Sequence, residues 1–107
     1  MDAVLRAIAE PRRREILQLI QGAELSSGKI AARFEVSGPA ISQHLKVLLE
    51  AGLVTMRKEG TRRLYRARPE GLAEVRNFLE AFWDEGLQSL KEAAEAAERR
   101  SKISGDN

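Results

Sequence analysis

The chain has 107 residues, contains no cysteine and carries a formal net charge of +2. This length is enough for one domain with a modest core. The lack of cysteine excludes disulfides, a thiolate metal site and a thiol redox switch. No apolar run is long enough to cross a membrane and no signal-peptide pattern is visible, so we expect a cytoplasmic protein.

The charges are unevenly distributed along the chain. Residues 1–68 hold 13 Lys or Arg against 7 Asp or Glu, whereas residues 69–107 hold 5 against 9. A basic N-terminal part suits a polyanion such as double-stranded DNA, with the acidic C-terminal part held away from it. Ordinary variation in surface charge would give the same totals, so the asymmetry alone does not decide between the two.

The N-terminal third of the chain predicts three short helices. The first covers residues 2–9, where apolar side chains recur at helical spacing. The second begins at Pro11 and ends at Gly22, and the third is capped by Ser26 or Ser27.

A fourth predicted helix has two different faces. It follows a turn over residues 35–38, is capped by Ser37 and ends at Gly52. One stripe is apolar and comprises Ile41, Leu45, Leu48 and Gly52. The opposite face is small and polar and comprises Pro39, Ser42, Gln43, Lys46 and Glu50. With the preceding helix it makes a helix-turn-helix, whose second helix presents such a face to base edges in the major groove.

Two β-type runs follow the fourth helix and predict a hairpin, the wing. The runs are residues 53–57 and 63–68, and the turn is residues 58–62, where Gly60 is available for positive φ. The wing is rich in basic side chains, which are Arg57, Lys58, Arg62, Arg63 and Arg66.

The last predicted helix begins at Pro69 and runs to about Arg99, and we expect residues 101–107 to be a disordered tail. Apolar side chains recur along it near heptad spacing, at Leu72, Val75, Leu79, Phe82, Gly86 and Leu90. The rest of the chain is too small to cover this length, so we expect a second copy to pack there, joined by the first helix. Folding back onto its own domain is the alternative. The predicted dimer residues are Leu5, Ile8, Leu79, Phe82, Trp83, Leu87 and Leu90.

Three segments of the chain resemble the ArsR family of bacterial winged-helix repressors. They are residues 10–17 (EPRRREIL), residues 41–54 (ISQHLKVLLEAGLV) and residues 60–65 (GTRRLY). The likeness covers roughly residues 2–98 and is greatest to the branch without metal-site cysteines, the SdpR-type autorepressors. It implies a homodimer that binds an imperfect palindrome in a promoter and blocks transcription.

Many members of this family release DNA when a metal binds. In this chain the family's thiol motif corresponds to residues 30–34, which hold no cysteine, and residues 70–98 hold no histidine. We therefore expect no metal and no other cofactor.

Ser42 and Gln43 are the predicted base contacts, because both side chains donate and accept hydrogen bonds and glutamine can pair with adenine. Lys46 is expected at a phosphate. His44 lies at the edge of the apolar stripe, where it could bond a phosphate or pack at the helix boundary. The predicted DNA-binding set is Ser37, Pro39, Ser42, Gln43, His44, Lys46, Arg57, Lys58, Arg62 and Arg63.

Three consecutive arginines, residues 12–14, begin the second helix, where their charge opposes the helix dipole. Two explanations are open: contact with phosphates, or ion pairs with Glu10, Glu15 or the partner subunit.

The sequence as a whole predicts a mainly α winged helix-turn-helix with about five helices and a small hairpin. Residues 1–100 are expected to form one DNA-binding and dimerisation domain. The predicted function is that of a homodimeric repressor acting on a promoter palindrome. Alternatives are a ligand- or metal-responsive sensor of the same fold, and a winged-helix module that binds a protein. No nucleophile–base pair or phosphate loop is visible, so we do not expect an enzyme.

Overall fold

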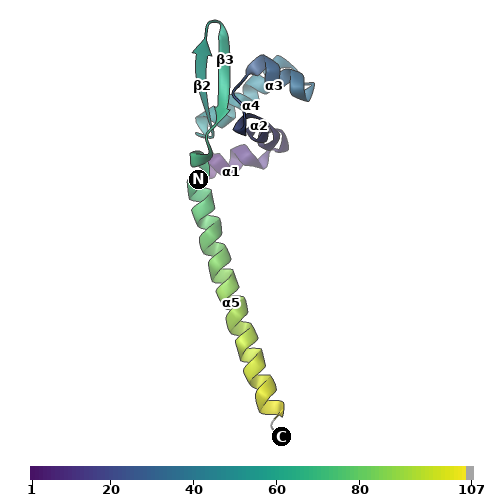
Figure 1. Ribbon diagram of the computed structural model, residues 1–107, viewed down its shortest axis with the longest axis vertical. Coiled ribbons are helices and arrows are strands. Elements are labelled where there is room, and N and C mark those ends of the chain that lie inside the picture. Colours follow the sequence, from purple (N-terminus) through teal and green to yellow (C-terminus); the bar gives the residue numbers. More distant parts are fainter. Residues whose placement is uncertain (106–107) are drawn as a thin grey trace. The chain divides into compact units, whose positions relative to one another are not determined.

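The structure, a computed structural model, describes residues 1–105, with side chains described through residue 101. The elements are α1 (Asp2–Ala9), α2 (Pro11–Gln21), β1 (Leu25–Ser26), α3 (Ser27–Phe34), α4 (Gly38–Glu50), β2 (Val54–Glu59), β3 (Arg62–Ala67), the 3₁₀ helix η1 (Pro69–Leu72) and α5 (Ala73–Gly105) (Figure 1). This order confirms the predicted fold class. No helix within the described residues is long and apolar enough to cross a membrane.

The chain divides into two compact units, Met1–Val75 and Arg76–Asn107. The first unit holds α1 to α4, the sheet, η1 and the beginning of α5. The described part of the second unit is a single helix, the remainder of α5. A lone helix has no core of its own, so the single domain expected over residues 1–100 stays a prediction.

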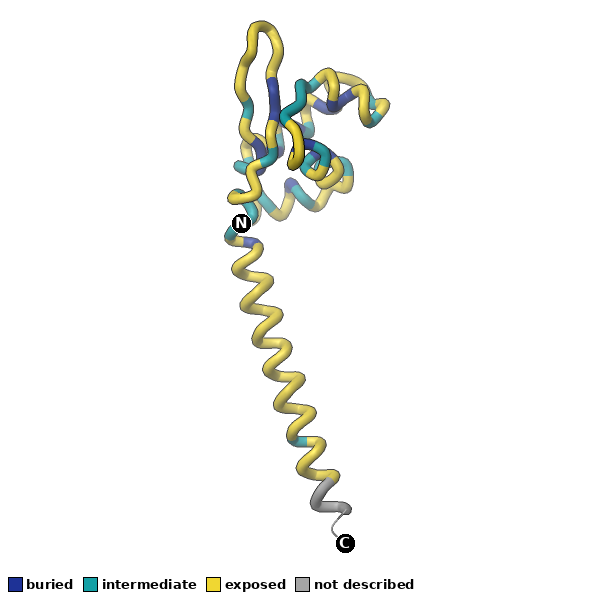
Figure 2. The backbone as a smooth tube through the Cα atoms, in the orientation of Figure 1, coloured by how far each residue is buried: buried dark blue, intermediate teal, exposed yellow. Residues whose placement is uncertain are grey.

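The core of the first unit lies where α2, α4 and the sheet meet (Figure 2). Helix α2 contributes Ile16 and Ile20, four residues apart and fully buried. The predicted stripe of α4 is confirmed, since Ile41, Leu45 and Leu48 are all fully buried. Burial of these side chains fixes which face of α4 points outward.

The ends of the helix-turn-helix follow from their capping residues. Ser26 accepts a hydrogen bond from the backbone N–H of Lys29 at 3.3 Å, and Ser37 accepts one from Ala40 at 3.2 Å. Both caps were among those predicted. The turn between α3 and α4 places Glu35 in the left-handed region, at φ 54°. This backbone conformation costs a residue with a side chain about 1–2 kcal/mol. Other contacts of the turn must offset that cost.

The sheet has the strand order β1-β3-β2 and is antiparallel throughout. The predicted five-residue turn is too long, because the ladder continues to the pair Glu59 and Arg62. These two side chains also form an ion pair at 3.3 Å. The turn is therefore only two residues, with Gly60 at φ 63°. Strand β1 was not predicted, since two residues carry no alternating pattern.

The start and end of the last helix also differ from the prediction. Residues 69–72 form a 3₁₀ turn, in which Gly71 donates to the carbonyl of Arg68 at 3.0 Å, and α5 begins only at Ala73. The helix then continues to Gly105, beyond the predicted end near Arg99, because extending a formed helix costs little per residue. Of the expected tail, residues 101–105 are helical and residues 106–107 lie outside the described residues.

Gly71 packs against the end of α4 so closely that a side chain has no room. A Cβ at this position would overlap the carbonyl oxygen of Gly52 and lie 3.1 Å from Leu53 Cδ2. We expect Gly71→Ala to lower the free energy of unfolding by about 1–3 kcal/mol, because backbone would have to move. Thermal unfolding followed by circular dichroism measures this loss.

The matched control for this substitution is Gly28→Ala, because a Cβ at Gly28 meets nothing within 4 Å. It should leave the melting temperature unchanged or raise it, since alanine favours helix more than glycine. Equal melting of Gly71→Ala and wild type would show that η1 is not held tightly against α4.

Candidate nucleic-acid interface

The outer face of α4 is polar and open to solvent. Ser42, Gln43 and Lys46 are exposed, as is Pro39 in the first turn. Ser37 is exposed too, but its hydroxyl already accepts the capping hydrogen bond. The structure therefore places four of these predicted residues on α4 and the fifth, Ser37, at its N-cap.

His44 is half-buried and ties α4 to α2. Its Nδ1 lies 3.4 Å from Arg13 Nη1. A guanidinium can only donate, so Nδ1 is the acceptor and a neutral ring carries its proton on Nε2. The predicted packing at the helix boundary is thus found, and Nε2–H remains as a donor that no described residue uses.

Arg13 and Arg14 have a role that neither prediction for them considered. Arg13 Nε donates to the carbonyl of Ala7 at 2.7 Å, and Arg14 Nη1 donates to the carbonyl of Ile8 at 2.6 Å. The last carbonyls of a helix have no partner within it, and cations are favoured at that end. These two arginines therefore hold the C-terminus of α1.

Arg12 behaves differently from its two neighbours. It forms the expected ion pair with Glu15, at 3.4 Å, and its guanidinium also lies 5.1 Å from the centre of the Phe34 ring. The second contact is a cation–π interaction that joins α2 to α3. This contact could not be predicted from the sequence, because Arg12 and Phe34 are 22 residues apart.

One face of the wing carries a chain of ion pairs. Arg57 lies 2.7 Å from Glu24 and 3.1 Å from Glu59, and Glu59 also pairs with Arg62. The hydrogen bond from Arg57 lowers the pKa of Glu24, and the same bond raises the pKa of Arg57. Two of the predicted DNA-binding arginines are therefore already neutralised in part by carboxylates.

Lys58 and Arg63 lie on the other face of the wing. They face each other directly across the β2–β3 ladder and both are exposed. Neither forms an ion pair within the part of the chain that the structure describes. Like charges directly opposite each other are unfavourable in an isolated hairpin, so this pair suits an external anion.

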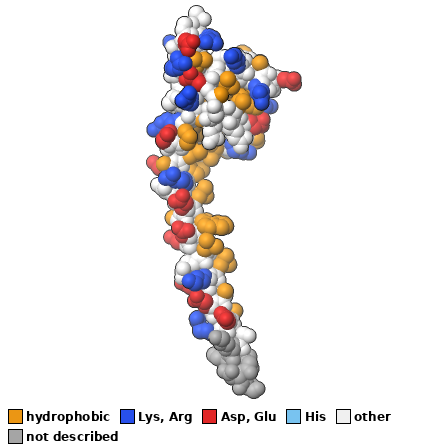
Figure 3. All heavy atoms as spheres, in the orientation of Figure 1, with side chains coloured by type: hydrophobic (Ala, Val, Ile, Leu, Met, Phe, Trp, Pro, Cys, Tyr) orange, Lys and Arg blue, Asp and Glu red, His pale blue; other side chains and the backbone are white. Residues whose placement is uncertain are grey.

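Within its own unit, α5 exposes a set of large apolar side chains (Figure 3). Phe82 is 68% exposed and Trp83 is 64% exposed. The remaining exposed members are Phe78, Leu79, Leu87 and Leu90. In the first unit, Leu5 of α1 is exposed and Ile8 is half-buried. Monomeric proteins rarely leave as many large apolar groups of one helix in water as α5 does.

Among the described residues, no group of three or more His, Cys, Asp or Glu side chains could hold a metal ion. The single histidine already contacts Arg13.

Comparison with known proteins places the chain in a family. The family model described as "Bacterial regulatory protein, arsR family" matches residues 10–56. The HTH-type transcriptional regulator Rv2034 of Mycobacterium tuberculosis is 44% identical over 86 residues, which cover 80% of each chain. The transcriptional repressor SdpR of Bacillus subtilis is 34% identical over 90 residues, which cover 84% of this chain and all of SdpR.

Solved structures agree with the sequence relatives. The NMR structure of the homodimeric winged helix-turn-helix DNA-binding domain Mb0332 from Mycobacterium bovis matches with a TM-score of 0.63. The two chains are 33% identical, and the match covers 78% of each.

A helix-turn-helix with an exposed polar second helix, followed by a basic hairpin, defines a winged helix-turn-helix protein. The chain belongs to the ArsR family of bacterial regulatory proteins. That family consists of transcriptional regulators.

Proposed function

We propose that this protein is a cytoplasmic, homodimeric repressor that binds a palindromic operator in double-stranded DNA. The observation that carries the proposal is the outer face of α4, where Ser42 and Gln43 are exposed on a helix whose other side is fixed in the core. Two such helices, one from each subunit, would enter successive major grooves about 10 base pairs apart.

The residues of α4 divide into two roles. Ser42 and Gln43 read base edges, because their side chains can both donate and accept hydrogen bonds. Lys46 contacts a phosphate and so fixes register without reading sequence. His44 Nε2–H is the second phosphate donor, since Arg13 already occupies Nδ1.

The homodimer is supported by the apolar side chains that α5 exposes and by the homodimeric relative from Mycobacterium bovis. Repression is supported by SdpR, which is a transcriptional repressor by name. Rv2034, by contrast, is named only as a regulator.

The test of this function is selection from a random duplex pool, followed by sequencing, at two salt concentrations. We expect an enriched palindrome and an affinity on the order of 10⁻⁸–10⁻¹¹ M at moderate salt. Salt-sensitive binding without an enriched motif would contradict sequence-specific recognition, and no binding at all would favour a protein partner for the α4 face.

The wing provides a second prediction, because its two faces differ in free charge. We expect the double variant Lys58→Gln, Arg63→Gln to bind all duplexes more weakly. Each lost phosphate contact removes about 0.9 from the slope of log affinity against log salt, so a dimer should lose about 3 to 4. Binding measured at several salt concentrations gives this slope.

The matched control removes the same charge from the other face of the wing. Arg57→Gln, Arg62→Gln should change the slope much less, since these arginines already pair with Glu24 and Glu59. Equal slopes for the two double variants would show that the ion pairs open on DNA and that both faces contact it.

A further inference from the structure

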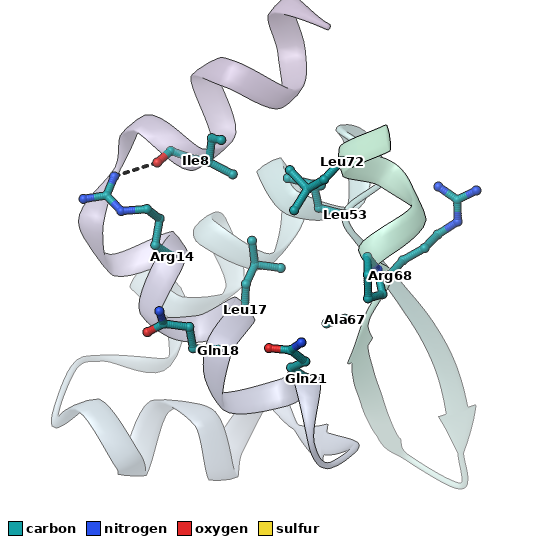
Figure 4. A pocket seen from close by; sticks show the side chains of 10 residues that line it. Ile8, Arg14, Leu17, Gln18, Gln21, Leu53, Ala67, Arg68 and Leu72 are labelled. Atoms are coloured by element: carbon teal, nitrogen blue, oxygen red, sulfur yellow. Dashed lines mark hydrogen bonds between the residues drawn. The ribbon is translucent and has the colours of Figure 1, made fainter. Parts of the chain in front are cut away.

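The first unit contains a cavity of about 280 Å³ beside the end of the wing that lies opposite the hairpin turn (Figure 4). It lies between α1, α2, the end of β3 and η1. Its walls are formed by Ile8, Arg14, Leu17, Gln18, Gln21, Leu53, Ala67, Arg68, Pro69 and Leu72. None of the residues assigned above to DNA contact belongs to it, whereas Ile8 is one of the predicted dimer residues.

The lining of this cavity is apolar with two amides at its edge. Leu17, Leu53 and Leu72 surround the space, and the side chains of Gln18 and Gln21 lie along one side (Figure 4). Neither glutamine forms a side-chain hydrogen bond with any other described residue. Two amides are therefore available to a guest.

The two arginines of the wall do not direct their charge into the cavity. Arg14 Nη1 donates to the carbonyls of Ile8 at 2.6 Å and Ala9 at 3.2 Å, and Arg68 Nη1 donates to that of Gly52 at 3.1 Å. Figure 4 shows both guanidinium groups turned away from the centre of the space. The cavity thus fits a neutral guest better than an anion, because an anion would lose its hydration without gaining an ion pair.

We propose that this cavity binds a small, neutral, mainly apolar molecule that carries one hydroxyl or carbonyl group. The apolar part packs against Leu17, Leu53 and Leu72, and the polar group bonds to Gln18 or Gln21. An apolar cavity of about 150 Å³ holds a single benzene ring, so this volume suits a guest of one to two rings.

The position of the cavity connects it to the DNA-binding residues. Leu53 lies three residues after the end of α4 and directly before β2, and the backbone N–H of Arg68 donates to the Leu53 carbonyl at 2.7 Å. A guest that contacts Leu53 and Arg68 together would favour one spacing between α4 and the wing. The regulatory part of this inference rests on the proposed function, and the binding part does not.

The test uses 2-naphthol as the probe, because it is neutral, has two rings and carries one hydroxyl. Titration into the ¹⁵N-labelled 107-residue protein should give saturable shifts at the amides of Leu17, Leu53 and Ala67. No saturable shift there, or shifts confined to α5 beyond Arg76, would overturn the proposal.

Two variants localise the site. Leu17→Trp fills the space and should weaken binding by about tenfold or more, because the indole would occupy the volume that the probe needs. Gln21→Leu keeps the fold, since Gln21 is exposed, and should weaken binding about fivefold through one lost hydrogen bond. Thr55→Val, exposed and outside the cavity, is the control and should bind as wild type does. Unchanged affinity in both Leu17→Trp and Gln21→Leu would place the probe elsewhere.

A second measurement separates this inference from the proposed function. Saturating 2-naphthol should change the affinity for the selected operator at least about threefold, and Leu17→Trp should abolish that change. If the protein binds the probe but no DNA, the ligand site is supported and the proposed repressor function is contradicted. Operator binding that does not respond to bound probe would reject the regulatory role of the site.

Discussion

Replacing Phe82 and Trp83 together by glutamate is expected to convert the protein from a dimer to a monomer. Both rings are mostly exposed in the single chain, and charged groups placed between two copies would have to be buried unpaired. Operator affinity should fall by about 10³ or more, because one subunit holds only half of the contacts. Sedimentation equilibrium and binding to the selected operator measure the two effects.

The control for this variant adds two charges elsewhere on the same helix. Asn77 and Gln88 lie about 120–180° around α5 from Leu79, Phe82 and Trp83, at 100° per residue. Asn77→Glu, Gln88→Glu should therefore remain a dimer. A Phe82→Glu, Trp83→Glu protein that still sediments as a dimer would remove α5 from the interface.

The double variant Ser42→Ala, Gln43→Ala should lose nearly all preference for the operator and keep weak binding to random DNA. Good base contacts contribute about 1–3 kcal/mol each, and a dimer makes every contact twice, so specific affinity should fall by about 10³ or more. Competition between the operator and a random duplex at fixed salt measures this preference.

Lys46→Ala is the comparison for base readout, since a phosphate contact carries no sequence information. It should weaken operator and random DNA by the same factor. If Ser42→Ala, Gln43→Ala also weakens both equally, then α4 positions the protein on DNA without reading bases through these residues.

The helix-turn-helix could be predicted from sequence because its signals are local. The cap Ser37, the buried stripe of α4 and the positive φ of Gly52 each belong to α4 or to a residue beside one of its ends. Short-range patterns of this kind determine where a helix begins, where it ends and which side faces the core.

The contacts that decide which basic residues are free could not be predicted in this way. Arg57 meets Glu24 across 33 residues of chain, and that meeting requires β1, a strand of two residues. Arg13 and Arg14 reach α1 carbonyls only because α1 turns back against α2. From the sequence alone, four basic residues of the wing are equally good candidates for DNA contact. The structure separates Arg57 and Arg62, which pair with carboxylates, from Lys58 and Arg63, which form no such pair among the described residues.

The arginine run at the start of α2 has a consequence for sequence variation. Arg13 reaches two carbonyls of α1 and the ring of His44 with one planar group, and Arg14 reaches two further carbonyls. Lysine is a point charge on a flexible stem and cannot span such partners. Exchange of arginine for lysine should therefore be tolerated at Arg63 on the wing and rejected at Arg13, although both positions keep the same charge.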